Sequence, residues 1–365
     1  MKTLTALHFE PSDILFFRDN RGFGPSDSGQ TSFPTVFPFY GALRTAFLRK
    51  KGVDFSRSES LQAYEKQVGN EEHPGLLRLL GPFLYHADGS GKTRYYLPTP
   101  ENVYHLGDSP KEFGCLQLDK QVSFQYRPGI MLHPLGSFSK AQPQKSAAEF
   151  PWMELSEMEK MKRGESFFPT SQEDVAKTLF SHESRLGIAL EKDRKKAKEQ
   201  MIYRLNAMAF REGAGFFVLV EQGEEILKGL DEVFLGGKRH TARLWKSSLQ
   251  TSLFDLVSTG DGENEKSLVL LSPGVFENGF VPGRDTGFFG SQLLALSNGK
   301  PLVISGWDLK NRRVKQMVHA LRPGTVFYVR GNPREEFLTQ RFAPFGFGKY
   351  FEAKIGRRCG ENHGK

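Results

Sequence analysis

The beginning of the chain restricts the fold most, because it places a strand, a long loop and a short helix in that order. Residues 4–17 alternate loosely and are rich in Leu and Phe, which predicts a strand. About twenty residues rich in Gly, Ser and Pro follow, a length typical of functional loops. A helix is then predicted over residues 38–50, where Phe39, Leu43 and Phe47 share one face. This order is typical of an α+β domain.

Strands and turns continue through the rest of the chain. Residues 213–222 form an apolar run that predicts a strand, and residues 233–245 predict two strand pieces around a Gly-Gly turn. Before them we expect a loop that carries His182 and Arg185. The charged stretch at residues 191–200 then predicts a solvated turn or a hairpin tip.

The length and the element order together predict two domains. A chain of 365 residues is long enough for two domains of ordinary size. Strands interspersed with one or two short helices in each half fit two βαββαβ units. We therefore predict an α+β protein with two ferredoxin-like (RRM-type) domains in tandem, with insertions, over residues 1–190 and 191–365. For residues 55–175, the sequence does not predict how the strands are connected and paired.

The net charge of +8 lies entirely in the last part of the chain. Residues 305–365 contain 13 basic and 5 acidic side chains, so the residues before them hold 37 of each and are neutral. A surplus concentrated in this way is typical of a surface that binds a polyanion, since each Lys or Arg at a phosphate releases counterions. A solvated basic face is the alternative.

The sequence predicts a soluble, cytoplasmic protein with no membrane contact. Its first residues lack the basic start and apolar core of a secretory signal, and no apolar run approaches the roughly 18 to 20 residues that span a bilayer. Cys115 and Cys359 are far apart and have no CxxC spacing. We therefore expect two free thiols, without a disulfide or a structural zinc site.

Known catalytic and cofactor motifs are incomplete in this sequence. A phosphate-binding P-loop fails because His86 stands where its first glycine belongs, and Phe351 replaces the third glycine of a dinucleotide fingerprint. His8, His182 and His240 are the only histidines near basic residues that could act as a general acid or base. We expect no catalytic residue, no metal and no cofactor.

Two loops combine glycine with positive charge. Glycine lets a backbone approach a ligand closely, and its N–H groups can bind a phosphate. An ordinary hairpin turn with basic flanks is the alternative for each loop. The first loop contains Arg341, Gly346, Gly348 and Lys349, and the second contains Gly236, Gly237, Lys238, Arg239 and Arg243.

Taken in order, several segments resemble one known family. The sequence FEPSDILFFRDNRGFG, followed by the polar loop and FYGALRTAFL, is similar to the amino-terminal signature of the RAMP proteins of CRISPR systems. The segments SHESRLGIALEKDRKKAKEQMIYRL, LGGKRHTARLW, ISGWDLKNRRVKQMVHALRPGTVFYVRG and FAPFGFGKY agree with it. Over essentially its whole length, the chain resembles the family of the third subunit of the type III-B Cmr effector complex.

This resemblance implies a role in antiviral defence as a ribonucleoprotein subunit. It implies two RRM-type domains that hold the repeat-derived 5′ handle of the CRISPR RNA (crRNA), beside the large polymerase-cyclase subunit and the backbone RAMP subunits. Target RNA is then contacted only indirectly. Members of the family are not considered nucleases, which agrees with the missing catalytic motifs. The glycine loop is shorter here than in many RAMP proteins.

On this reading, handle phosphates lie along basic residues of an interdomain cleft, and unstacked bases rest on aromatic or guanidinium planes. Arg44 contacts RNA or is structural, because the apolar face of its helix packs on the sheet. The expected RNA-binding residues are Arg18, Arg21, Arg44, His182, Arg185, Lys238, Arg239, Arg243, Arg341, Gly346, Gly348 and Lys349.

Two other functions are compatible with the residues. One is a RAMP endoribonuclease that matures the guide RNA, with His182 or His8 as its catalytic group. The other is a scaffold whose basic surface binds acidic protein instead of RNA. The first requires cleavage of a repeat transcript without metal, and the second requires weak RNA binding with little dependence on salt.

Overall fold

The structure is a computed structural model of the chain. It describes residues 2–17, 28–29, 31–106, 109–127, 130–136, 143–145, 149–190, 197–255, 265–277, 289–308 and 313–354. Within these ranges the fold is mixed α/β, with many strands and few helices. The helices are α1 (Phe37–Lys50), α2 (Ser58–Gln62), α3 (Glu65–Val68), α4 (Leu155–Arg163) and α5 (Gln172–Thr178), with short 3₁₀ turns η1 (Glu224–Leu227), η2 (Gly237–Arg239) and η3 (Ala343–Phe345).

A seven-stranded antiparallel sheet forms the larger layer. Its strands, in spatial order, are β12 (Trp152–Glu154), β4 (Thr93–Pro98), β3 (Arg78–Ala87), β15 (Ala214–Gln222), β1 (Lys2–Pro11), β17 (Thr241–Thr251) and β16 (Glu232–Phe234). The strand β15 reads as a continuous apolar run because both of its faces are covered. Four neighbouring strands lie in the spatial order β17, β1, β15, β3. Of these four, they are the fourth, first, third and second along the chain.

A four-stranded antiparallel sheet repeats that order in the last part of the chain. Its strands are β19 (Gln292–Ser297), β24 (Val326–Arg330), β18 (Glu265–Leu270) and β25 (Tyr350–Ala353). Read from β25, the spatial order is β25, β18, β24, β19, which are again the fourth, first, third and second strands along the chain. Between β18 and β19, the described residues 271–277 and 289–291 form no helix.

The two sheets divide the chain at a different place from the expected domain boundary. The larger sheet takes strands from both sides of residue 190, and the smaller sheet begins at Glu265. The boundary expected at 190/191 falls between two paired strands that are inserted between β3 and β15.

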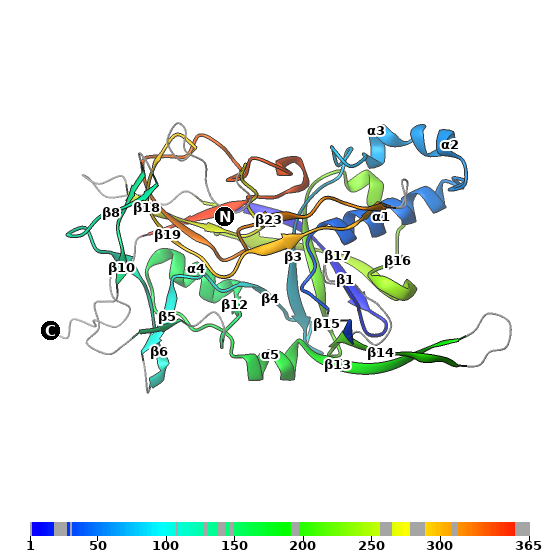
Figure 1. The fold of residues 1–365 in the computed structure, drawn as a ribbon, viewed down its shortest axis with the longest axis horizontal. Helices are drawn as coiled ribbons and strands as arrows, with labels where there is room; N and C mark the ends of the chain where they lie inside the picture. The colour runs from blue at the N-terminus through cyan, green and yellow to red at the C-terminus, as the bar shows by residue number, and fades with distance from the viewer. Residues whose placement is uncertain are drawn as a thin grey trace.

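The inserted hairpin consists of β13 (Phe180–Leu190) and β14 (Ala197–Phe210), with the short β2 (Ser28–Gly29) alongside β14. Figure 1 shows it extending along one side of the molecule, beyond the sheets. The loop expected at His182 and Arg185 is therefore wrong, because both residues lie in β13 and pair with β14. The remaining short strands are β5 (Val103–Leu106), β6 (Ser109–Cys115), β7 (Gln117–Leu118), β8 (Phe124–Arg127), β9 (Ile130–Leu132), β10 (Leu135–Gly136), β11 (Pro143–Lys145), β20 (Leu302–Ile304), β21 (Trp307–Asp308), β22 (Arg313–Val314) and β23 (Val318–Ala320).

Helix α1 covers one face of the larger sheet, as the sequence predicted. Pro38 stands in its first turn, where a missing N–H costs nothing, and Arg49 and Lys50 close its last turn. Its buried Phe39 packs edge-on against Phe9 of β1, with ring centroids 4.9 Å apart. The beginning of α1 is thereby fixed relative to the sheet (Figure 1).

The opposite face of the larger sheet packs against the smaller sheet and α4. Side chains alternate along each strand, so Val269 and Tyr328 enter this shared core while Leu268 and Phe327 point to the far side. Irregular segments cover that far side. The fold therefore consists of α1, the larger sheet and the smaller sheet in layers.

A buried lysine secures the start of the link between the sheets. Lys162 is 6% exposed, and its ammonium donates to the carbonyl oxygens of Ser252, Leu253 and Asp255 at 2.5–2.9 Å. These carbonyls directly follow β17, so α4 holds the chain where it leaves the larger sheet. Three carbonyl acceptors satisfy the three ammonium hydrogens.

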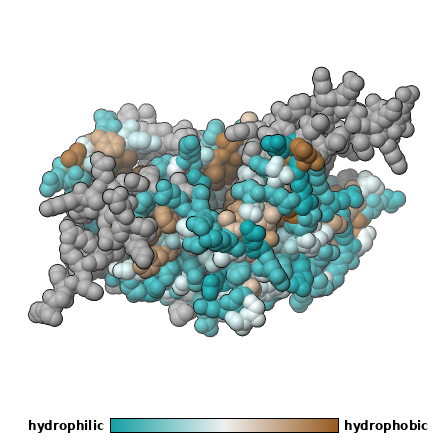
Figure 2. Space-filling model, turned by 90° about the horizontal axis from the view of Figure 1, so that it is seen from below, coloured by the Kyte–Doolittle hydropathy of each residue, from teal (hydrophilic) through white to brown (hydrophobic). Residues whose placement is uncertain are grey.

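Hydrophilic residues cover most of the face seen in Figure 2, and hydrophobic residues reach the surface in small areas that include a hollow near the middle. In the part of the chain that the structure describes, no helix combines the length and apolar character needed to cross a membrane.

Candidate nucleic-acid interface

A cavity of about 520 Å³ lies between segments of the two sheets. The loop before α1, the β3–β4 region and the β13–β14 hairpin form one side, and segments that follow β18 and β23 form the other. Much of the lining is proline, because the cavity is made where strands end and loops begin. Its lining residues include Phe33, Thr35, Trp152, Gln172, Phe180, Ser181, His182, Met208, Leu271, Leu302, Arg322 and six prolines.

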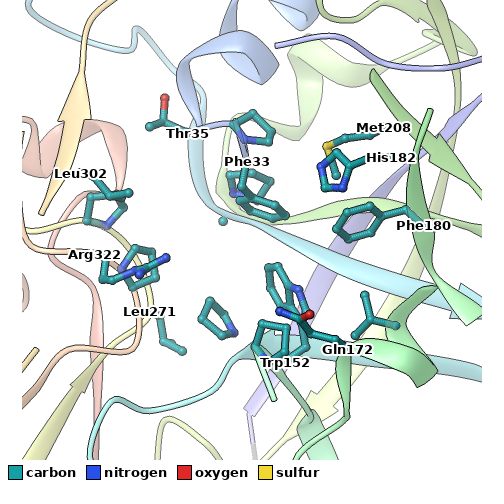
Figure 3. A pocket seen from close by; sticks show the side chains of 18 of the residues that line it. Phe33, Thr35, Trp152, Gln172, Phe180, His182, Met208, Leu271, Leu302 and Arg322 are labelled. Carbon is teal, nitrogen blue, oxygen red and sulfur yellow. The ribbon is translucent and has the colours of Figure 1, made fainter. Parts of the chain in front are cut away.

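Aromatic rings stand on several sides of this cavity (Figure 3). Phe33 is 38% exposed, although its ring contacts the buried Trp152 at 4.8 Å and Phe216 at 5.4 Å between centroids. Phe180 contacts the His182 ring edge-on at 5.7 Å. The rings are held from behind by the core and present free surface to the cavity.

Arg322 supplies the positive charge of the cavity. Its guanidinium points into the open space in Figure 3, and its Nε lies 3.7 Å from Oε1 of Glu101. Glu101 is only 7% exposed and is fixed by its backbone, which donates to the Gly324 carbonyl and accepts from Ser297. The carboxylate thus lies beneath the arginine and tethers it, while the arginine side chain remains 44% exposed.

His182 is the predicted site residue that the structure places in this cavity. It lies on β13 opposite Met208 of β14, and its side chain is exposed. Together with the hydroxyls of Thr35 and Ser181, its imidazole gives the apolar cavity a few groups that can donate or accept hydrogen bonds. A mainly apolar pocket with a few convergent polar groups is typical of a ligand site.

A second group of predicted residues surrounds residues 10–17, where β1 ends. Arg185 reaches Asp13 at 3.5 Å, and His240 lies 3.7 Å from the same carboxylate. Arg243 pairs with Glu10 at 2.6 Å and is itself 69% exposed. This segment leads directly to Arg18 and Arg21, which lie outside the described residues.

The basic turn η2 belongs to the same group. The N–H of Gly237 donates to the Phe16 carbonyl at 2.8 Å, which holds the turn against the end of β1. Lys238 and Arg239 follow with φ of 58° and 59°, a left-handed backbone that turns both exposed side chains away from the β16–β17 ladder. We call Arg185, Lys238, Arg239 and Arg243 the β1-end basic group.

The glycine loop near the C-terminus lies elsewhere and is buried. A Cβ on Gly346 would stand 2.1 Å from the Leu79 carbonyl oxygen, and φ is +82°. A Cβ on Gly348 would stand 2.7 Å from the Leu338 backbone. The glycines therefore let η3 pack closely against β3, which supplies a physical reason for them that does not involve a ligand.

Two of the predicted cations near this loop have protein partners. Lys349 is 7% exposed and pairs with Glu221 at 3.2 Å and with Glu336. Arg44 donates to the carbonyls of Asn70 and His73 at 3.3 and 3.4 Å. Its guanidinium also lies over the rings of Tyr40 and Phe345, and burial lowers its pKa to about 10. Arg341 is exposed, with its guanidinium 5.2 Å from the Phe342 ring.

Sequence reasoning missed most of the cavity. Phe33, Trp152, Phe180 and Arg322 were not among the expected site residues, because each is an ordinary core or loop residue in its own segment. A usable signal was present in Phe33, which stands beside Pro34 in the long loop before α1. The described residues hold no group of three His, Cys, Asp or Glu side chains that could bind a metal ion.

The family follows from comparison with known proteins. A sequence pattern described as "CRISPR-associated protein (Cas_Cmr3)" matches residues 7–351. The chain belongs to the Cas_Cmr3 family. This match confirms the family resemblance expected from the sequence. No protein with a curated description matches the chain.

Solved structures of type III CRISPR complexes resemble this Cas_Cmr3 protein. A chain in a cryo-EM structure of the Type III-B Cmr-beta bound to cognate target RNA is 16% identical, with 89% of this chain and 86% of that chain covered and a TM-score of 0.47. A chain of the Csm3–Csm4 subcomplex of a type III-A interference complex is 14% identical, with 90% and 98% covered and a TM-score of 0.43. A chain of a Csm1–Csm4 cassette with AMPPNP is 14% identical, with 99% and 100% covered and a TM-score of 0.39. At these values, the family assignment rests on the sequence match.

Proposed function

We propose that this Cas_Cmr3 protein is a non-catalytic RNA-binding subunit of a type III-B Cmr effector complex that holds the 5′ handle of the crRNA. The cavity between the two sheets carries this proposal. Its exposed aromatic rings and its tethered arginine are the groups that bind single-stranded RNA, where bases stack on rings and cations contact phosphates. Family membership supplies the crRNA as the RNA in question.

The handle also crosses the β1-end basic group. His182 and Arg185 are three residues apart on β13, so their side chains point to opposite faces of the hairpin, with about 10 Å of strand between them. In the proposal, the handle passes from the cavity around the β13–β14 hairpin to the exposed side chains of Arg185, Lys238 and Arg239. Arg18 and Arg21 extend this path in the proposal. The buried Gly346 turn and Lys349 are not needed for it.

The strand orders support two ferredoxin-like domains. Each sheet contains four strands in the order fourth, first, third, second, all antiparallel, which is the arrangement of a βαββαβ unit. In this proposal the insertion from β4 to β14 belongs to the first domain, and the link after β17 joins the two. Irregular segments replace most of the helices of the second domain.

Absence of catalysis is part of the proposal. His8 has no exposed surface and its ring stacks on Trp245 at 3.5 Å, so it cannot reach a scissile phosphate. His240 lies beside Asp13. His182 remains as the exposed histidine of the cavity, and in our proposal it is a hydrogen-bonding group and not a general base.

The proposal also assigns protein partners. The protein bridges the large polymerase-cyclase subunit to the backbone RAMP subunits, and it meets target RNA only through the crRNA. The hairpin of β8 and β9 supports a protein-binding surface, because Val122, Phe124 and Met131 are 47–53% exposed there. Several exposed apolar side chains on one hairpin are typical of a contact with another protein.

Fluorescence anisotropy with a labelled handle oligonucleotide tests this function. We expect tighter binding of the handle than of a scrambled RNA of equal length, with affinity falling steeply as salt rises. Replacing Lys238 and Arg239 by Ala should weaken binding and reduce the salt dependence, whereas Arg57→Ala should not, since the exposed Arg57 pairs with Asp54 three residues before it and belongs to neither the cavity lining nor the β1-end basic group. Equal affinity for the scrambled RNA, or cleavage of the handle, would contradict the proposal.

A further inference from the structure

We infer that the cavity between the sheets takes one extruded nucleobase of the RNA, stacked on Phe33, with Arg322 at the phosphate that follows it. This inference rests on the proposed function. It specifies that one base enters the cavity, which residue the base stacks on and which residue contacts the phosphate. Four features of the cavity carry it: its size, its flat apolar surfaces, its charge and the prolines of its lining.

The size of the cavity suits a small flat group. About 520 Å³ is within the range of about 300–1,000 Å³ that holds small ligands. A single base with its ribose and phosphate is the largest unit of RNA that such a cavity encloses.

The apolar surfaces of the cavity are planar. Phe33, Trp152 and Phe180 surround its centre in Figure 3, and the Arg322 guanidinium adds a fourth plane. The Phe33 ring keeps 38% of the residue exposed although Trp152 and Phe216 pack against it. Planar side chains around a gap bind a flat aromatic ligand more tightly than an aliphatic one, because a stacked ring contacts the whole planar face.

The charge of the cavity suits a phosphate ester. Arg322 and His182 line it, and the described lining contains no carboxylate. Glu101, which is outside the lining, is buried beneath the arginine and holds it in place. An extruded base brings its own phosphate, so the arginine gains a negative partner without losing the tether that orients it.

The prolines argue against a peptide in the same cavity. Pro34, Pro82, Pro98, Pro151, Pro273 and Pro323 line it, and proline has no N–H to donate. A peptide that adds to a strand edge needs a row of free backbone donors and acceptors. Stacking needs none, so the lining favours a base over a main chain.

A double-mutant experiment with abasic RNA tests the inference. Handle oligonucleotides that each lack one base are titrated against the full-length protein and its Phe33→Ala variant, by anisotropy. We expect one handle position at which loss of the base weakens binding to the wild type about tenfold or more but hardly changes binding to Phe33→Ala. A loss of this size is in the range of one base stacked on one aromatic side chain. Phe33→Trp should restore the preference for that position.

Controls and contrary outcomes separate this inference from the proposed function. Phe55→Ala is the matched control, because Phe55 is 46% exposed and lies outside the cavity lining. If the wild type prefers the handle but no position couples to Phe33, the inference is wrong and the proposed function stands. If the wild type does not prefer the handle, the proposed function fails. If Phe33→Ala leaves RNA binding intact and weakens assembly with the other subunits, the cavity holds a protein segment and the inference is overturned.

Discussion

Protonation of one buried histidine should make the protein less stable in mild acid. His8 of β1 has no exposed surface, and its ring lies between Trp245, stacked at 3.5 Å with an interplanar angle of 1°, and Tyr85, edge-on at 4.7 Å. Burial lowers the pKa of His8 to about 4, despite hydrogen bonds to the backbone that favour its charged form. The native protein therefore holds a neutral imidazole at neutral pH.

The sign and size of the effect follow from these pKa values. Between the ordinary value of 6.5 and the folded value of about 4, the unfolded chain binds a proton that the native protein does not. The contribution of His8 to the free energy of unfolding is therefore greatest above pH 6.5, and it falls by about 1.36 kcal/mol for each unit of pH below that value. Lowering the pH from 7.5 to 5 should remove about 2 kcal/mol.

Comparison with His8→Phe isolates this contribution. The phenyl ring keeps the stack on Trp245 and cannot titrate, so the variant should lose about 2 kcal/mol less than the wild type between pH 7.5 and pH 5. Urea unfolding at both pH values, followed by tryptophan fluorescence, measures the four free energies. The same pH dependence in both proteins would refute the reasoning, because the other histidines are common to both.

Two further predictions concern contacts that stabilise the fold. Lys162→Met should lower the free energy of unfolding by about 2 to 3 kcal/mol, because it leaves buried carbonyls without a donor, whereas Lys160→Met, at a side chain 41% exposed, should cost under about 0.5 kcal/mol in the same denaturation assay. Gly346→Ala should cost about 3 kcal/mol or more through its contact with the Leu79 carbonyl, and Gly91→Ala, with a similar φ of +85° but open space around it, should cost about 1 kcal/mol. Equal losses within either pair of variants would contradict the assigned contacts.

Much of the larger sheet and of helix α1 could be predicted from local sequence patterns. The helix at Phe37–Lys50 was predicted within a residue, since Pro38 and the spacing of Phe39, Leu43 and Phe47 are local signals. The strand at 213–222 and the turn at Gly236–Gly237 were also found, because a continuous apolar run and a Gly-Gly pair depend on near neighbours.

Errors arose where distant segments decide the structure. His182 and Arg185 were expected in a loop because their segment is polar, but pairing with β14 makes it a strand. The division into two sheets after β17 carries no local signal, because it depends on which strands pair.

The candidate site was harder to predict than the fold. Positive charge and glycine are visible in a sequence, so the expected residues were drawn from them. The structure shows that Gly346, Lys349 and Arg44 have partners within the protein. The cavity depends instead on Phe33, Trp152 and Arg322, which come from three distant segments and whose arrangement only tertiary packing reveals.

Crosslinking of the handle within a reconstituted Cmr complex tests the central claim most directly. A crRNA with photoreactive 4-thiouridine at each handle position is irradiated in the assembled complex, and the crosslinked peptides of this subunit are identified by mass spectrometry. We expect crosslinks to the peptides that contain Phe33 and Phe180, which both line the cavity. A bound handle that crosslinks to this subunit only outside the cavity lining would contradict it.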